Sequence, residues 1–199
     1  STAIDKNHNE MYAELSKKNI PFYHRSELLH KIFSLKKSIA VAGSHGKTST
    51  SAMIAQILIE SGIDPAVMVG GEVPFLSGRG GRWGHGDWGV YESDESDGTF
   101  LHHSPSIKVV TNIDNDHLDH YKTFDGLVLA FSKYMENLAD SKSIVYADDN
   151  GNTLALQKIH DRKGILTYSL KENSLGEKNV QFEILNGSLA FQKNGNSHS

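Results

Sequence analysis

Short apolar runs alternate with amphipathic segments along most of the chain. The apolar runs are rich in β-branched residues and predict buried strands at residues 39–42, 65–69, 88–92, 107–111, 143–147 and 164–168. Apolar residues at helical spacing predict helices at residues 9–19, 26–34, 47–61, 123–138 and 152–161. This alternation favours an α/β fold in which helices flank a mostly parallel sheet.

Three of the predicted helices carry further signals. Ser26 is expected to cap the second helix, and Gly62 is expected to end the third. The core-facing stripe of the third helix is predicted to consist of Met53, Ile54, Ile57 and Leu58. The stripe of the helix at 123–138 is predicted to consist of Phe124, Leu127, Phe131, Tyr134 and Leu138.

The alternation breaks in two places. Residues 70–86 contain seven glycines and are predicted to form a long loop. Residues 180–185 alternate between apolar and polar side chains and are followed by Asn186-Gly187, a strong turn signal. This second break predicts a small β-hairpin near the end of the chain.

Residues 39–49 (I-A-V-A-G-S-H-G-K-T-S) combine a buried strand, a glycine turn and the start of a helix. Gly43 and Gly46 let the backbone bend and bring its N–H groups close to anionic oxygens. Lys47 can place its charge on nucleotide β- and γ-phosphates, and the Thr48 hydroxyl can bind Mg²⁺. The segment predicts a phosphate-binding loop, although Val41 stands where the common G-x-x-x-x-G-K-T pattern has its first glycine.

Two acidic segments follow two further predicted strands. Residues 92–97 (E-S-D-E-S-D) hold four carboxylates, and residues 114–119 (D-N-D-H-L-D) hold three carboxylates and His117. Because ligands of open parallel sheets bind beyond the carboxyl ends of the strands, we expect both segments to meet the phosphate loop. Either segment alone could be a solvated loop. Together with the phosphate loop, they predict a site for a nucleotide and Mg²⁺.

These three motifs resemble those of the Mur ligase family, the ATP-dependent amide-bond ligases of peptidoglycan assembly. The resemblance rests on residues 43–48 (G-S-H-G-K-T), 92–100 (E-S-D-E-S-D-G-T-F) and 111–119 (T-N-I-D-N-D-H-L-D). The loop histidine and the tail of the acidic motif are most similar to the members that join L-alanine to UDP-N-acetylmuramate. Ser44 and Ser93 stand where the family usually has threonine and alanine, and neither removes a phosphate or metal ligand.

The resemblance implies an activity, cofactors and site residues. ATP with Mg²⁺ would phosphorylate the lactyl carboxylate of UDP-N-acetylmuramate, and the amine of L-alanine would attack the acyl phosphate. Lys47 and His117 would be catalytic, with Asp116 supporting His117. Thr48 and Glu92 would hold one Mg²⁺, and His117 would lie by a second Mg²⁺ near the carboxylate. The nucleotide-binding residues would be Gly43, Ser44, His45, Gly46, Lys47, Thr48 and Ser49, with His45 facing the sugar.

Two other functions remain open at this point. A ligase that recycles murein tripeptide resembles this chain at the phosphate loop, but its acidic motif usually has a different tail. A nucleotide-binding switch module would share the loop, yet it would need no second acidic cluster at a strand end. Both alternatives predict that ADP release would not depend on UDP-N-acetylmuramate together with a single amino acid.

The resemblance also implies a division of the chain. Residues 1–36 are expected to be a remnant of an N-terminal UDP-binding domain with its linker, and residues 37–199 an incomplete central ATP-binding domain. The third domain of the family would be absent. The 199-residue chain is therefore expected not to ligate by itself.

Composition excludes several classes of protein. The net charge of −4 argues against a nucleic-acid partner, and the lack of cysteine excludes a disulfide framework. No apolar stretch has the length of a membrane span or of a signal-peptide core, so we expect a cytoplasmic protein without a membrane partner. Among the eleven histidines, adjacent His102 and His103 are expected to be surface or substrate-facing residues rather than metal ligands.

Overall fold

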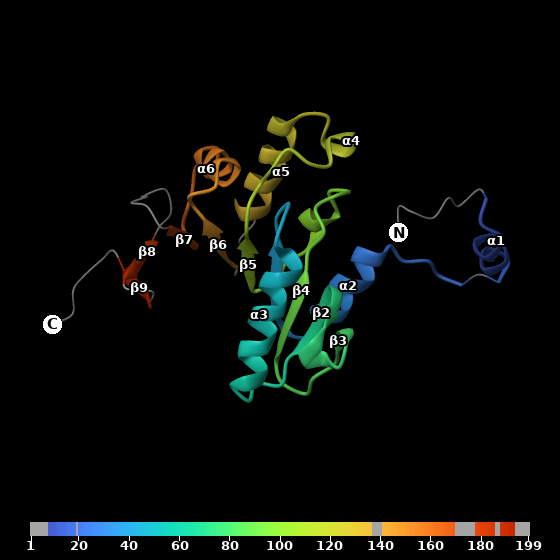
Figure 1. Ribbon diagram of the computed structural model, residues 1–199. Helices are drawn as coiled ribbons and strands as arrows, with labels where there is room; N and C mark the ends of the chain where they lie inside the picture. The colour runs from blue at the N-terminus through green and yellow to red at the C-terminus, as the bar shows by residue number, and fades with distance from the viewer. Residues whose placement is uncertain (1–7, 19, 137–140, 170–177, 186–187, 194–199) are drawn as a thin grey trace.

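A nine-stranded sheet is the centre of the molecule in the computed structural model, which describes residues 8–18, 20–136, 141–169, 178–185 and 188–193 (Figure 1). The strand order is β3-β2-β4-β1-β5-β6-β7-β8-β9. Neighbouring strands run parallel except for the β2–β3 and β8–β9 pairs. The strands are β1 Lys37–Ala42, β2 Ala66–Val73, β3 Arg79–Arg82, β4 Trp88–Glu92, β5 Ile107–Val110, β6 Lys142–Tyr146, β7 Ile165–Ser169, β8 Lys178–Leu185 and β9 Ser188–Lys193.

Helices cover both faces of this sheet, as the predicted α/β fold requires. They are α1 Glu10–Lys17, α2 Arg25–Phe33, α3 Lys47–Glu60, α4 Leu118–Tyr121, α5 Phe124–Glu136 and α6 Asn150–Gln157, with 3₁₀ turns η1 Pro74–Leu76 and η2 Thr99–His102. Strand alternation assigns the faces. Ile39 and Val41 of β1 pack in the core beneath α3, whereas Ala40 and Ala42 belong to the clusters beneath α2 and beneath α5 and α6. The central strand is therefore buried on both sides.

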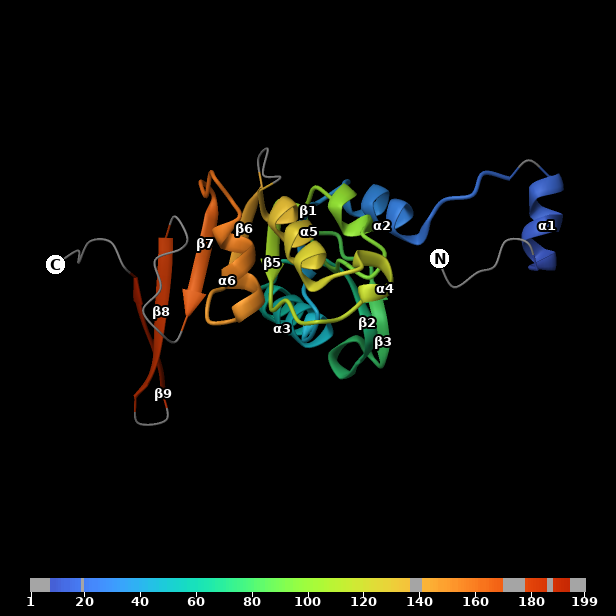
Figure 2. The same ribbon diagram turned by 90° about the horizontal axis from the view of Figure 1, so that it is seen from above.

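Helix α1 lies apart from the sheet at one end of the molecule, and β8 and β9 lie at the other (Figures 1 and 2). Helix α1 has no buried residue, so it adds nothing to the core. The predicted turn Asn186-Gly187 lies outside the described residues, and the two strands beside it pair antiparallel. Within the described ranges, no helix has the length and apolar character needed to cross a membrane.

The prediction that residues 70–86 form a loop is wrong. Strand β2 continues to Val73, and β3 pairs with it antiparallel. The glycines permit this pairing because the two backbones approach closely: a Cβ on Gly80 would lie 2.9 Å from the Val69 carbonyl oxygen. Glycine therefore allows a tight β-ribbon here instead of breaking the strand.

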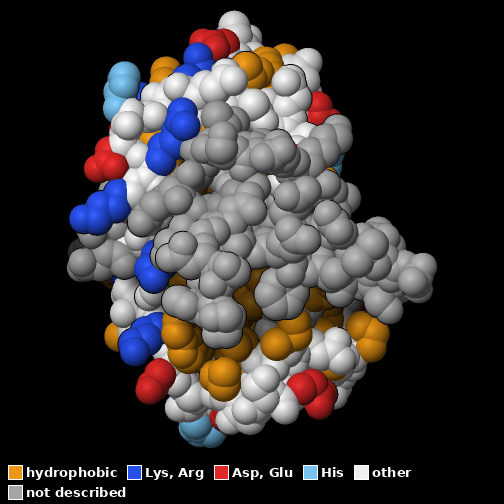
Figure 3. Space-filling model, turned by 90° about the vertical axis from the view of Figure 1, so that its left-hand side faces the viewer, with side chains coloured by type: hydrophobic (Ala, Val, Ile, Leu, Met, Phe, Trp, Pro, Cys, Tyr) orange, Lys and Arg blue, Asp and Glu red, His pale blue; other side chains and the backbone are white. Residues whose placement is uncertain are grey.

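The predicted stripe of α3 is wrong in half of its members. Ile54 and Leu58 pack against the core beneath α3, but Met53 and Ile57 are 58% and 64% exposed. The apolar residues of α3 are nearly consecutive from 52 to 59 and so point in all directions around the helix, and their spacing does not specify which side is buried. Hydrophobic side chains also gather in the lower half of the face drawn in Figure 3.

The other helix signals have mixed outcomes. The cap of α2 is His24 rather than Ser26: the Glu27 carboxylate accepts from the His24 backbone N–H at 2.9 Å, and Ser26 lies within the helix. Gly62 has φ +75°, as expected of a residue that ends a helix. The stripe of α5 is confirmed by the buried Leu127, Phe131 and Tyr134, whereas Leu138 lies outside the described residues.

Candidate active site

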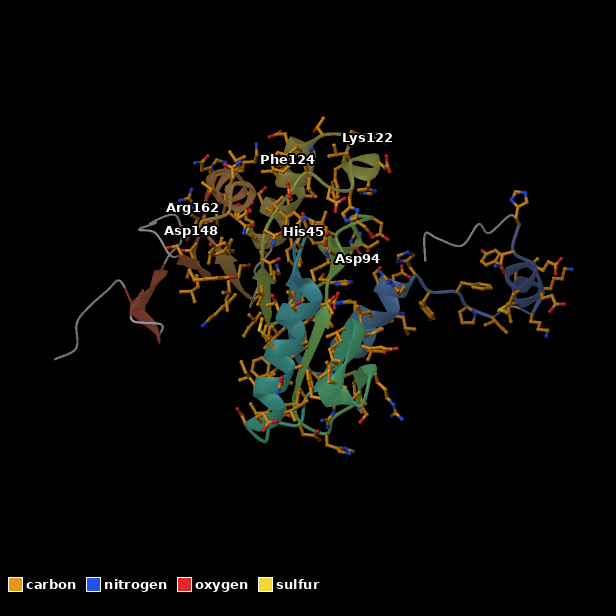
Figure 4. The ribbon with its side chains drawn as sticks, in the orientation of Figure 1. His45, Asp94, Lys122, Phe124, Asp148 and Arg162 are labelled. Atoms are coloured by element: carbon orange, nitrogen blue, oxygen red, sulfur yellow. The ribbon has the colours of Figure 1, made fainter. Side chains whose placement is uncertain are left out.

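Three loops meet at one edge of the sheet. Strand β1 lies between β4 and β5 and runs parallel to both, so the loops that follow these strands leave the sheet side by side. His45 and Asp94, which belong to two of these loops, lie at the same edge in Figure 4. The predicted convergence of the three motifs is confirmed.

The turn after β1 requires glycine at two positions. Gly43 has φ +134°, and a Cβ there would lie 2.1 Å from the Thr111 hydroxyl oxygen. Gly46 has φ +83° and precedes the first residue of α3. A larger residue at Gly43 would therefore push the turn away from the loop that follows β5.

The loop after β5 holds this turn in place. The backbone N–H groups of Ser44 and His45 donate to the carbonyl and side-chain oxygens of Asn112, each at 2.9 Å. The Asn112 amide donates in return to the His45 carbonyl at 2.9 Å. The first N–H groups of α3 have no acceptor within the helix. The anion-binding donors of this turn are thus expected at Lys47 to Ser49, while Ser44 and His45 are engaged by protein.

Lys47 lies across the turn and closes it. Its ammonium donates to the Gly43 carbonyl at 2.6 Å and to the Ser44 carbonyl at 3.3 Å. It also lies 2.9 Å from the Glu95 Oε1 atom, which has no exposed surface. This buried ion pair places the positive charge at the N-terminus of α3, where phosphate groups bind in related loops.

Glu95 lies at the centre of the candidate site, although the sequence did not single it out. Its Oε1 lies 3.4 Å from His117 Nε2, and its Oε2 is buried without a hydrogen-bond partner. The Tyr121 hydroxyl donates to the Glu95 carbonyl. Burial raises the pKa of Glu95, and the charge of Lys47 opposes that rise. The Oε1 atom thus lies between an ammonium and an imidazole, and the buried Oε2 atom is an acceptor that a cation would satisfy.

The predicted Mg²⁺ ligands lie beside two different groups. Glu92 accepts from the Gly70 N–H at 2.6 Å, and the Thr48 methyl group lies 3.4 Å from where a Cβ on the adjacent Gly71 would be. His117, the predicted ligand of the second ion, contacts Glu95. Within the described part of the chain, no three acidic or histidine side chains form a metal-binding group. Because Mg²⁺ keeps water and phosphate ligands, a hydroxyl and isolated carboxylates still fit an ion that arrives with a nucleotide.

His117 has a strained backbone. Its φ of +55° is unusual for a residue other than glycine. Asp116 accepts from the His117 N–H at 2.8 Å, and its other oxygen lies 3.7 Å from His117 Nε2. The strain and these contacts together direct the imidazole toward Glu95, which is typical of a functional position.

A cavity of about 350 Å³ opens beside this cluster. Its polar lining residues include Lys47, Glu92 and His117, and its apolar lining residues include Leu29, Met68 and Val69. A cavity of this volume with a mixed lining suits a small organic ligand. His45 is not in this lining; its side chain is 65% exposed, and its Nε2 atom lies 3.5 Å from the Asp114 Oδ2 atom.

His103 is buried, in contrast to the exposed His102, and it lines the cavity beside the cluster. It is 2% exposed, its Nδ1 lies 3.1 Å from the Ser93 hydroxyl, and its Nε2 has no hydrogen-bond partner. Burial lowers the pKa of His103 to about 4, and nearby His30 contributes in the same direction. The folded protein therefore keeps this imidazole neutral.

This burial predicts acid sensitivity. Between pH 6.5 and about 4, His103 is protonated in the unfolded chain but not in the folded chain. The free energy of unfolding therefore falls as the pH falls through that window. The contribution is at most about 3 kcal/mol. Urea unfolding at pH 7 and pH 5 should show a smaller pH dependence for His103→Asn than for wild type. The exposed His160→Asn should match wild type, and an unchanged pH dependence in His103→Asn would contradict the prediction.

Comparison with known proteins decides the family. The family model of the Mur ligase middle domain matches residues 88–198, more than half of the 199-residue chain. This chain belongs to the Mur ligase family. The match includes both acidic loops of the candidate site, and the phosphate loop precedes it.

Individual Mur ligases extend the similarity to the rest of the chain. UDP-N-acetylmuramate–L-alanine ligase of Bradyrhizobium sp. strain BTAi1 is 40% identical over 193 residues, which cover 96% of this chain and 40% of that protein. The structure of the Thermotoga maritima enzyme of the same name has a TM-score of 0.73 at 27% identity, over 89% of this chain and 39% of that one. The chain thus spans about 40% of the length of the relatives it matches.

One solved structure with a different substrate shares the fold. The Neisseria ligase for UDP-N-acetylmuramate and L-alanyl-γ-D-glutamyl-meso-diaminopimelate has a TM-score of 0.76 at 20% identity, over 96% of this chain and 63% of that one. At this identity the likeness concerns the fold alone. The fold of a Mur ligase middle domain is therefore common to enzymes with different amine substrates.

Proposed function

We propose that the full-length protein joins L-alanine to UDP-N-acetylmuramate in peptidoglycan precursor synthesis, with ATP and Mg²⁺ and through an acyl phosphate. The observation that carries this proposal is the cluster of Lys47, Glu95 and His117 at the N-terminus of α3, beside a cavity for a second substrate. The identity of 40% to a ligase of this name supports the choice of substrates. We infer that residues 1–36 belong to the linker from a UDP-binding domain, residues 37–199 to the ATP-binding domain, and that the enzyme is cytoplasmic.

In this mechanism, the Lys47 ammonium changes its hydrogen-bond acceptors when ATP binds. Its ammonium turns from the Gly43 and Ser44 carbonyls toward the β- and γ-phosphates and offsets the charge that develops as the γ-phosphoryl group leaves ADP. The N–H groups at the start of α3 bind the same phosphates. The clamp from Asn112 keeps the turn rigid, so these donors need little reorganisation during the reaction.

Glu95 and His117 act on the other side of the γ-phosphate. Thr48 and Glu92 would hold one Mg²⁺, and His117 beside Glu95 would hold a second; the ions would supply charge neutralisation for the phosphate and the attacking carboxylate. Glu95 holds Lys47 and His117 at a common oxygen and so maintains their separation. His117 faces the cavity and orients the lactyl carboxylate for in-line attack. The apolar lining residues accommodate the sugar's methyl groups.

The site separates the alanine ligase from one of the two other functions but not from both. A tripeptide-recycling ligase would use the same phosphates and the same carboxylate, because the amine arrives only after the acyl phosphate has formed. A switch module would have no use for a cavity that ends at Lys47 and His117. The 40% identity to an alanine ligase favours L-alanine over the tripeptide.

ADP release by the full-length protein tests the proposal. We expect release that depends on both UDP-N-acetylmuramate and L-alanine, with formation of the amide product detected by mass spectrometry. Release that requires L-alanyl-γ-D-glutamyl-meso-diaminopimelate instead of L-alanine would establish the recycling ligase. Release with ATP alone would establish the switch module.

A further inference from the structure

Helix α2 is attached to the acidic loop by an ion pair and by a second polar contact at its start. The Arg25 guanidinium lies 2.5 Å from the Asp94 Oδ2 atom. The His24 Nε2 atom lies 3.6 Å from the Asp97 Oδ2 atom. These contacts join the segment before the phosphate loop to the loop after β4, about 70 residues later.

Both aspartates use their other oxygen to fold the acidic loop. The Asp94 Oδ1 atom accepts from the Ser96 N–H at 3.0 Å, and the Asp97 Oδ1 atom accepts from the Thr99 N–H at 3.0 Å. Burial would raise the pKa of Asp94, but the hydrogen bonds from Ser96 and Arg25 outweigh it and lower that pKa. Each carboxylate therefore bridges its own loop and α2.

These two aspartates flank Glu95. A shift of Asp94 or Asp97 relative to the sheet must move the backbone between them, and with it the carboxylate that contacts Lys47 and His117. Glu95 has no exposed surface, so it has little freedom to compensate by changing its rotamer.

The two ends of α2 are held differently. At its last residue, Phe33 is buried, packs 4.7 Å from the Tyr91 ring and lies over Gly89. At its first turn the contact is the ion pair of Arg25 and Asp94, which are 62% and 40% exposed. Close packing fixes the end of the helix, whereas the exposed ion pair leaves its start adjustable.

We propose that Arg25 is a positioning residue: together with His24 it ties α2 to the acidic loop and so holds Glu95 in place against Lys47 and His117. This inference rests on the proposed ligase function. Because Glu95 acts mainly when charge develops at the γ-phosphate, a loosened loop lowers kcat more than it raises the KM for ATP. An exposed ion pair contributes modestly, so the expected loss of kcat is about two- to tenfold.

A double-mutant cycle in the full-length protein tests this role. We expect Arg25→Ala and Asp94→Asn each to lower kcat by this factor with the KM for ATP within about twofold of wild type, and the double variant to be no worse than either single variant. Arg25→Lys should recover part of the loss because it restores the charge. Arg82→Ala is the matched control, since Arg82 forms an ion pair with Asp64 outside the cavity lining.

Arg25 also lines the cavity, so the cycle must separate positioning from direct binding. If Arg25 bound the substrate, Arg25→Ala would raise the KM for UDP-N-acetylmuramate and Asp94→Asn would leave kcat unchanged; this outcome, or additive losses, would overturn the proposal. Hydrogen exchange in residues 93–98 gives a readout without activity. It should increase in Arg25→Ala and not in Arg82→Ala, and equal exchange in both would also overturn it. A wild-type protein that lacks ligase activity would refute the proposed function without changing this exchange comparison.

Discussion

Lys47→Ala is expected to reduce turnover of the full-length protein by about two to four orders of magnitude. Lys47 supplies the ammonium that this structure places at the N-terminus of α3, and alanine leaves the charge of the transferring phosphoryl group without that partner. The loss should appear in kcat, because the interaction strengthens as the phosphoryl group leaves ADP. Single-turnover measurement of ADP formation with saturating substrates checks it.

Lys47→Ala is also expected to affect stability, and this second effect can be measured separately from the loss of turnover. Lys47→Ala leaves the buried Glu95 carboxylate without its cationic partner, which destabilises the fold or forces Glu95 to take up a proton. The double variant Lys47→Ala with Glu95→Gln should therefore recover stability while remaining inactive. Lys133→Ala is the control, because Lys133 is exposed on α5. Near-normal turnover in Lys47→Ala would mean that the turn is only structural.

Glu95→Gln is expected to lower turnover at least about a hundredfold, which is typical of removing one preorganised charged group from an active site. Glutamine keeps the shape and one carbonyl oxygen but loses the charge shared by Lys47 and His117. Glu92→Gln is the matched comparison. Glu92 lies at the Gly70 N–H, outside that triad, so its loss should weaken Mg-ATP binding and affect kcat less. Calorimetric titration with Mg-ATP, followed by single turnover, measures both quantities.

The free energy of unfolding of Glu95→Gln provides a second test, which does not depend on activity. The pKa of Glu95 is raised in the folded state, so the folded chain holds a proton more readily than the unfolded chain does. Ionised Glu95 therefore costs stability at neutral pH, and the cost disappears as the pH falls below the ordinary value of 4.5. Glu95→Gln should be more stable than wild type at pH 7 and no more stable at pH 4. If Glu92→Gln lost more turnover than Glu95→Gln, the assignment of the two carboxylates would be reversed.

The comparison of these carboxylates indicates how the site is built. Glu92 is the last residue of β4, and Glu95 lies three residues further on in a loop. Spacing along a strand indicates a direction for Glu92, but no periodicity applies in the loop. Glu95 points to Lys47 because Asp94 and Asp97 fold the loop and a lysine 48 residues earlier lies opposite.

The sequence by itself determined the α/β class, most of the helices and strands that flank the site, and the strand–turn–helix at residues 39–49. Those features depend on local periodicity and on glycines whose positive φ no other residue adopts readily. Tertiary structure decided which side of α3 is buried, that residues 70–86 contain a paired strand, that His103 is inside, and that Glu95 joins Lys47 and His117. Each of these features depends on contacts between residues far apart in the chain. Burial and strand pairing are set by neighbours in space, and the local spacing of residues does not specify those neighbours.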